Sequence, residues 1–236
     1  MAEQVPGAAT RVEVFADITC PFTHVGLKRV VELMADTAQP VDVVVRAWPL
    51  EWVNGSVMEV AAVQVKAEAL CRQLDVADFD GLRADRWPTT TIPALNLAAE
   101  AYERDTATGL AVSLAIRVAL FEQGLDVSDP AVLTAIAVEH GLAGPDNAGP
   151  DNAGPDNAGQ DNAGPDNANQ ATDAAPAVRA DYEDGRARGV SGSPHFWVDQ
   201  NDFFCPSLDL GHDDDGNLTA QFDAAGLEQF LVHLGL

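Results

Sequence analysis

The stretch VEVFADITCPFTHVGLKRV, from Val12 to Val30, decides the fold of this chain. Apolar residues share one parity from Arg11 to Ile18, which is typical of a β-strand with one buried face. Cys20 and Pro21 follow, and proline is favoured at the first position of a helix. From Phe22 to Thr37 the apolar residues recur at helical spacing. The stretch therefore predicts a strand that leads directly into a helix, with a cysteine at the junction.

A second strand and a long helical block follow this junction. The β-branched stretch from Val41 to Trp48 predicts a short strand, and strand, helix and strand in this order form a βαβ unit with parallel strands. From Ser56 to Leu142 apolar residues step by threes and fours, which predicts helices only. Within this block, Asp129 and Pro130 mark the N-cap and the first position of one helix.

The carboxyl-terminal part returns to a mixture of helices and strands. It predicts a helix from Pro176 to Arg188, strands at Pro194 to Val198 and around Phe203 to Leu210, and a final amphipathic helix through Leu227 to Leu234. The order is βαβ, a helical insertion, then ββα. This is the order of an α/β, thioredoxin-like fold with an all-helical insertion domain. The core is then predicted at residues 11–55 and 176–236, and the insertion at 56–142.

A five-residue repeat, AGPDN, separates the insertion from the rest of the core. It occurs five times in a row from Ala143 to Asn167, with Gln160 in place of one proline. Each unit lacks a bulky apolar residue, so burial does not offset the entropy lost on ordering. The right-handed β-helix of pentapeptide-repeat proteins needs such a residue inward in every unit. A disordered loop is therefore predicted over 143–172.

Charge and composition exclude several functions. The net charge of −24 argues against contacts with a nucleic-acid backbone. No apolar run is long enough to span a bilayer, and the first fifteen residues lack an apolar signal segment, so a cytoplasmic protein with no membrane partner is expected. Three cysteines, Cys20, Cys71 and Cys205, are too few and too scattered for a disulfide framework or a zinc site. No metal is expected, and any cysteine chemistry is that of an individual thiol.

Three stretches together resemble a known family: Val12 to Val30, Leu114 to Leu142, and ARGVSGSPHFWV at Ala187 to Val198. The sequence is similar to the DsbA-like group of the thioredoxin superfamily, close to its cytosolic branch. That branch is related to 2-hydroxychromene-2-carboxylate isomerases and kappa-class glutathione transferases. The third stretch is the most specific, because the family carries a Gly-Val-x-Gly-x-Pro-x-Phe signature.

The resemblance implies a thiol-disulfide oxidoreductase with Cys20 as its catalytic cysteine. It implies that Pro194 is cis and faces Cys20, and that the backbone of Ser193 pairs with the substrate. Pro21 and Phe22, beside the cysteine, complete the substrate-binding set. From the residues alone, a trans proline that opens an edge strand is the alternative for Pro194.

The position of Cys20 gives a physical reason for reactivity. A sulfur at the start of a helix lies near backbone N–H groups that stabilise a thiolate. A small buried cysteine at a strand end is the alternative. Thr23, one turn later, either directs its hydroxyl towards the sulfur or bonds its own backbone.

Thr23 is also where the sequence departs from the family, whose dithiol members carry Cys-x-x-Cys. A single cysteine forms a mixed disulfide that another thiol must release. Glutathione or mycothiol would serve as co-substrate, or Cys205 would be the resolving thiol if a hairpin returned it opposite Phe196. A packed strand cysteine is the favoured interpretation of Cys205, because hairpin register can slip by one residue. Cys71 is interpreted as structural.

The predicted function is therefore thiol-disulfide exchange through the single cysteine of the CPFT motif, with no obligatory cofactor. The partner is a small thiol, or a protein or small molecule that contains a disulfide, and a homodimer is compatible with the sequence. Two alternatives stay open: a glutathione- or mycothiol-dependent isomerase or transferase, and a binding protein that kept the fold and lost the chemistry.

Overall fold

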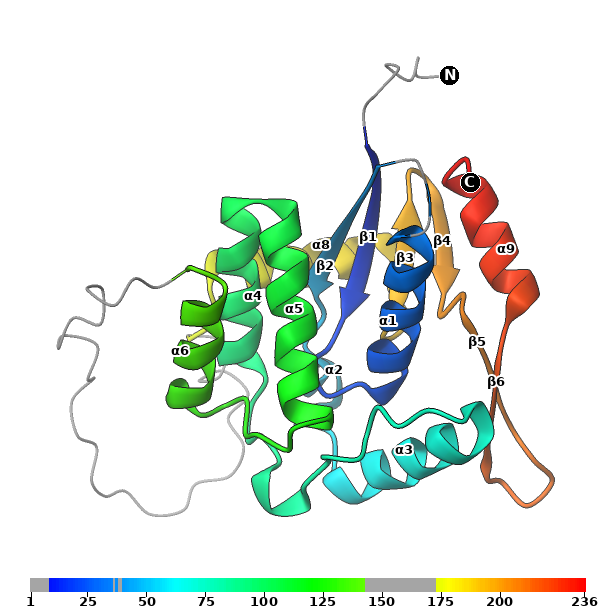
Figure 1. Ribbon diagram of the computed structural model, residues 1–236, viewed down its shortest axis with the longest axis horizontal. Helices are drawn as coiled ribbons and strands as arrows, with labels where there is room; N and C mark the ends of the chain where they lie inside the picture. Colours follow the sequence, from blue (N-terminus) through cyan, green and yellow to red (C-terminus); the bar gives the residue numbers. More distant parts are fainter. Residues whose placement is uncertain (1–8, 36, 38–39, 143–172) are drawn as a thin grey trace, which may run out of the picture.

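A four-stranded sheet forms the centre of the molecule (Figure 1). The computed structural model describes residues 9–35, 37, 40–142 and 173–236, so the loop predicted over 143–172 lies outside the described residues. The strand order is β2 (Val41–Ala47), β1 (Thr10–Ala16), β3 (His195–Val198) and β4 (Asn201–Phe204). β1 and β2 are parallel, while β3 runs antiparallel to both of its neighbours. The predicted parallel βαβ unit is thereby confirmed.

Helices account for most of the remaining described residues. They are α1 (Pro21–Ala35), α2 (Leu50–Asn54), α3 (Val60–Leu74), the 3-10 helix η1 (Ala84–Arg86), α4 (Ile92–Arg104), α5 (Thr106–Phe121), α6 (Pro130–Glu139), α8 (Pro176–Arg188) and α9 (Ala224–His233). None of the described helices is long and apolar enough to cross a membrane. The predicted helices at 176–188 and within 56–142 are confirmed, and the Asp129 carboxylate accepts the Ala131 N–H as an N-cap.

The two faces of the sheet are covered by different helices. α1 and α9 pack on one face, where Val14, Leu27, Phe196 and Phe230 belong to one buried cluster. α8 lies behind the sheet in Figure 1 and covers the other face. These faces follow from the alternation of side chains along β1, because successive residues point to opposite sides.

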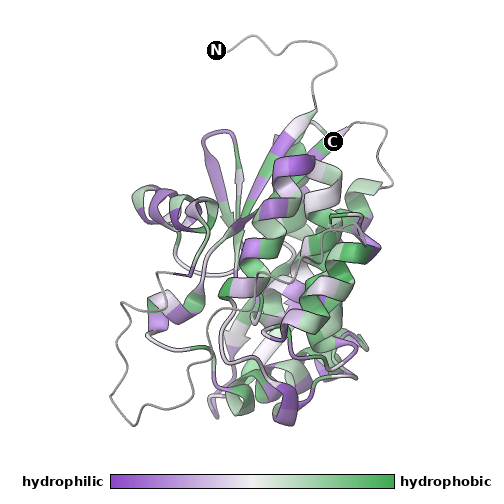
Figure 2. Ribbon diagram, turned by 90° about the vertical axis from the view of Figure 1, so that its left-hand side faces the viewer, coloured by the Kyte–Doolittle hydropathy of each residue, from purple (hydrophilic) through white to green (hydrophobic). Residues whose placement is uncertain are grey.

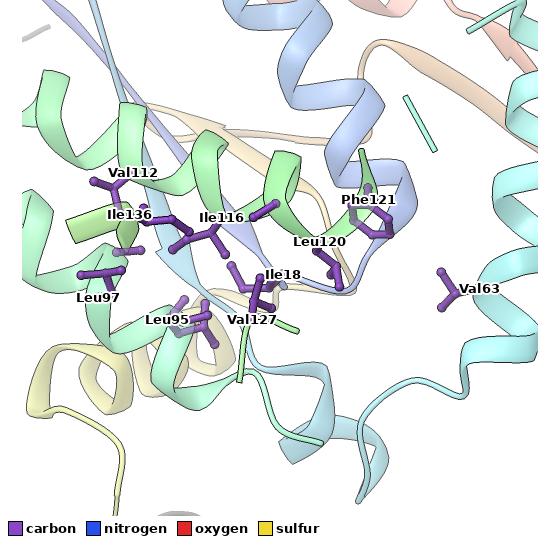
Figure 3. Packing of buried hydrophobic residues seen from close by; sticks show 14 of the residues in the cluster. Ile18, Val63, Leu95, Leu97, Val112, Ile116, Leu120, Phe121, Val127 and Ile136 are labelled. Atoms are coloured by element: carbon purple, nitrogen blue, oxygen red, sulfur yellow. The ribbon is translucent and has the colours of Figure 1, made fainter. Parts of the chain in front are cut away.

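The helical block stands beside β2 and has its own core. Its side chains come mainly from α4, α5 and α6, and Ile18 joins them from the loop after β1 (Figure 3). In Figure 2 the helices of this block are mostly green, the colour of hydrophobic residues. Since the loop that carries Ile18 also leads to Cys20, packing of the block fixes the position of the cysteine.

One predicted strand is wrong. The stretch around Phe203 to Leu210 is not continuous: β4 ends at Phe204, and a further strand, β5 (Leu208–His212), begins after a turn. Cys205 adopts a positive φ of 48° in this turn, and Pro206 lacks the N–H that a continuing ladder would need. β5 pairs with β6 (Leu218–Phe222), which the sequence analysis missed, in a separate two-stranded antiparallel sheet.

Candidate active site

Cys20 lies in the junction between β1 and α1, immediately before Pro21. The side chain is only 3% exposed, and its thiol donates a hydrogen bond to the Ser193 carbonyl oxygen at 3.0 Å. The His24 N–H bonds back to the Cys20 carbonyl, so the first turn of the helix begins at the cysteine. Cys20 therefore stands at the N-terminal end of α1, which is the positive end of the helix dipole.

The Ser193–Pro194 segment faces this junction from the start of β3. The peptide bond between the two residues is cis. β3 runs antiparallel to β1, and this pairing carries the beginning of β3 to the end of β1. The Ser193 hydroxyl accepts the Asp17 N–H at 2.9 Å and hydrogen-bonds to the Thr23 hydroxyl at 2.8 Å. Cys20, Thr23, Ser193 and Pro194 therefore come together from two distant parts of the chain.

Thr23 acts on this segment through Ser193. It is fully buried on the first turn of α1, and its hydroxyl partner is the serine hydroxyl, with either oxygen as the donor.

The two substrate-binding candidates on the same helix differ in burial. Pro21 is buried, whereas Phe22 is half-buried, packs against the helical block and has the Lys66 ammonium 5.8 Å from its ring centre.

Asp17 is a functional candidate that the sequence analysis missed. Its carboxylate is completely buried and accepts hydrogen bonds from the Thr19 N–H at 2.7 Å and the Thr19 hydroxyl at 2.5 Å. It also accepts the Leu50 N–H at 2.9 Å and the Thr91 hydroxyl at 3.4 Å. Burial raises the pKa of Asp17 above its ordinary value, although these hydrogen bonds oppose the shift. One carboxylate thus holds the loop before Cys20 against the starts of α2 and α4.

Arg117, also missed, supports the same loop from α5. The side chain is fully buried, and it donates to the Asp17 carbonyl at 3.2 Å and to the Ser113 hydroxyl at 2.7 Å. Burial lowers the pKa of Arg117 to about 10, and the negative charge of Asp17 opposes that shift. The available signal was a charged residue within the otherwise apolar stretch LAIRVALF, residues 114–121.

Cys205 lies in the turn after β4, and the predicted position opposite Phe196 is wrong. Phe196 pairs with Phe203, and His195 pairs with Phe204. Cys205 instead continues the ladder by one residue, because its N–H donates to the Pro194 carbonyl at 3.1 Å. The hairpin turns one residue earlier than expected, at Asp199 and Gln200, and so brings Cys205 next to the proline.

His195 links the segment that precedes Pro194 to β4. Its Nδ1 accepts the Ser191 N–H at 3.2 Å, so Nε2 carries the proton and donates to the Asp202 carboxylate at 3.0 Å. The imidazole is 3% exposed and joins β4 to the segment that leads to Ser193. This contact limits the movement of the carbonyl that bonds Cys20.

A cluster of His24, Asp78 and Glu122 is the group with metal-ligand geometry among the described residues. The Lys28 ammonium contacts Asp78 at 2.5 Å and Glu122 at 3.1 Å. Because the Lys28 ammonium bonds to both carboxylates, the cluster is an ion-pair network that ties α1 to the helical block.

Acidification is expected to destabilise the protein through His24. Burial lowers the pKa of His24 to about 4, from an ordinary value of 6.5. Between these values the unfolded chain binds a proton that the folded chain does not, so stability falls as pH falls through this window. The loss is up to about 3 kcal/mol, at ~1.4 kcal/mol per unit of pKa. Urea unfolding from pH 7 to pH 4 measures it.

The variant His24→Leu should flatten that dependence relative to the unchanged chain, whereas His212→Leu, at an exposed histidine, should keep it. An unchanged pH dependence in His24→Leu would show that other groups cause the loss.

Comparisons with known proteins identify the family and the fold. A family model described as a DSBA-like thioredoxin domain matches residues 11–214. No curated protein sequence matches the chain. Among solved structures, the chain is similar to a probable DsbA oxidoreductase from Streptomyces coelicolor, with 23% identity, a TM-score of 0.59, and coverage of 95% of this chain and 88% of that one.

Two further solved structures share the fold. Cytosolic disulfide reductase DsbM from Pseudomonas aeruginosa, with GSH, is 17% identical, with a TM-score of 0.55 and coverage of 95% of this chain and 96% of that one. A 2-hydroxychromene-2-carboxylate isomerase is 14% identical, with a TM-score of 0.52 and coverage of 82% and 88%. The predicted α/β thioredoxin-like fold is confirmed, and because the family model spans most of its length, the chain belongs to the DSBA-like thioredoxin domain family.

Proposed function

We propose that this protein is a thiol-disulfide oxidoreductase in which Cys20 is the nucleophile. The observation that carries the proposal is the placement of the Cys20 sulfur at the start of α1, 3.0 Å from the Ser193 carbonyl beside Pro194. Helix N–H groups stabilise a thiolate at such a position, and the thiolate is the form that attacks a disulfide.

The hydrogen bond of the resting thiol suggests how a substrate is aligned. The Ser193 carbonyl accepts the proton of the Cys20 thiol. Once the thiol ionises, this donor is lost and the carbonyl can accept an N–H from the substrate backbone. Thr23 and Asp17 both bond to the Ser193 hydroxyl and hold the segment in place during this exchange. Ionisation of the nucleophile and alignment of the substrate are thereby linked.

The proposed co-substrate is a low-molecular-weight thiol, glutathione or mycothiol. Support comes from Thr23, which occupies the place of the second motif cysteine. Further support comes from the similar structure of the disulfide reductase DsbM, which is described with GSH. We also place the protein in the cytosol, as that reductase is described.

A turnover assay tests this function. The reduced full chain is incubated with bis(2-hydroxyethyl) disulfide and either glutathione or mycothiol, and formation of the oxidised thiol is followed. The rate is expected to rise above background in proportion to protein concentration with at least one of the two thiols. No acceleration with either thiol would contradict the proposal.

A glutathione-dependent isomerase is the second candidate. Thr23 in place of the second motif cysteine favours it, because the motif then lacks the dithiol that disulfide exchange normally uses. The same assay distinguishes the two functions, since an isomerase leaves the total amount of reduced thiol unchanged.

A further inference from the structure

Cys20 and Cys205 reach the same short segment from opposite sides. The Cys20 thiol bonds to the Ser193 carbonyl at 3.0 Å, and the Cys205 N–H bonds to the Pro194 carbonyl at 3.1 Å. The two cysteines therefore contact consecutive carbonyl groups. Both are free thiols and both are 3% exposed.

The turn that carries Cys205 is anchored rather than free. Within it, the Leu208 N–H donates to the Cys205 carbonyl at 3.1 Å. The Ser207 hydroxyl donates to the Gly26 carbonyl of α1 at 3.3 Å, and a Cβ placed on Gly26 would lie 3.1 Å from that hydroxyl and 3.9 Å from the Pro194 ring. Helix α1 thus packs directly on both the turn and Pro194, and this contact keeps Cys205 at the end of the sheet where Cys20 lies.

The charges of the two thiols are linked. Burial raises the pKa of Cys205, and the negative charge of the Cys20 thiolate raises it further. Capping Cys20 in a mixed disulfide removes that charge. Cys205 then ionises more readily than it does beside the Cys20 thiolate. It therefore becomes a better nucleophile once Cys20 is part of a mixed disulfide.

We propose that Cys205 resolves the mixed disulfide formed on Cys20; this inference rests on the proposed function. Cys20 first attacks a substrate disulfide, forms a bond to one sulfur and releases the other as a thiolate. The Cys205 thiol then loses its proton and its sulfur attacks the Cys20 sulfur. The second substrate sulfur leaves as a thiolate and takes up that proton.

The electrons balance over the two steps. The substrate disulfide gains two electrons, and the cysteine pair loses two as a Cys20–Cys205 disulfide forms. Two equivalents of the low-molecular-weight thiol then reduce this internal disulfide and form its own oxidised dimer. Cys71 takes no part in these reaction steps, because it lies on α3 beside Asp78 and Asp80. It therefore provides a matched control.

The test uses 5,5′-dithiobis(2-nitrobenzoate), which releases one coloured thiolate when it caps a thiol and a second one when the cap is resolved. Reduced full-length chain is given one equivalent, and the cap is followed by intact mass. Cleavage at Lys and Arg puts the cysteines on three separate peptides, 12–28, 67–72 and 189–236. The unchanged chain and Cys71→Ser are expected to lose the cap and yield 12–28 linked to 189–236.

In Cys205→Ser the cap should persist on 12–28, with release slowed by about tenfold or more. Adding Thr23→Cys to that variant should restore release, because it supplies a thiol on the same helix turn. Equal release from Cys205→Ser and the unchanged chain would overturn the inference while the proposed function stands. A chain that never accepts the cap at Cys20 would overturn the proposed function itself. The linked peptides are detected in the unchanged chain. The inference can therefore be tested even if the Cys205→Ser variant does not fold.

Discussion

Replacing Cys20 with serine is expected to abolish disulfide reduction. Serine keeps the size of the side chain and can still donate to the Ser193 carbonyl, but its hydroxyl does not ionise near neutral pH. The unchanged chain and the Cys20→Ser variant differ only in the nucleophilic atom, so the fold should be retained. We expect turnover to fall to background, a loss on the order of 10³-fold.

Cys71→Ser is the matched control for this experiment, because it removes a thiol on α3 that is more accessible than Cys20. It should keep full activity. If Cys20→Ser retained turnover while Cys71→Ser lost it, the nucleophile would have to be reassigned.

Replacing Asp17 with alanine is expected to cause the largest loss of stability. The substitution leaves the buried donors of Thr19 and Leu50 without their acceptor, and it leaves the Arg117 guanidinium buried without the opposing charge. Breaking a buried polar network in this way costs roughly 3–5 kcal/mol. Urea unfolding measures the difference, and Asp42→Ala, at an exposed carboxylate on β2, should change it by less than about 0.5 kcal/mol.

The variant Asp17→Asn separates the charge from the hydrogen bonds. Asparagine keeps one acceptor oxygen and introduces an amide N–H₂ group that faces donors, so an intermediate loss is expected. A loss for Asp17→Ala no larger than for Asp42→Ala would show that water or a local rearrangement replaces the network.

Local patterns predicted the part of the fold that depends on neighbouring residues. The alternation in β1, the Cys-Pro pair and the helical spacing after it are signals within one short stretch, and they gave the junction that positions Cys20. The helix at Pro176–Arg188 was predictable in the same way, because Pro176 opens it and Gly189, with a positive φ, closes it.

Contacts between distant residues were not predictable from such patterns. Asp17 and Arg117 are separated by 100 positions, and only the packing of α5 against the strand end brings them together. Cys205 illustrates a second limit: a hairpin that turns one residue earlier changes the partner of every following residue. This shift moved Cys205 from Phe196 to Pro194, and with it the chemistry open to the thiol.

The first thiol to react with oxidised glutathione identifies the nucleophile of this protein, and we expect it to be Cys20. Reduced full-length chain is mixed with oxidised glutathione at neutral pH, quenched at early times and digested at Lys and Arg. Glutathione is expected first on peptide 12–28, which holds Cys20, although Cys71 is the more exposed thiol. Glutathione that appeared first or only on peptide 67–72 would contradict the claim.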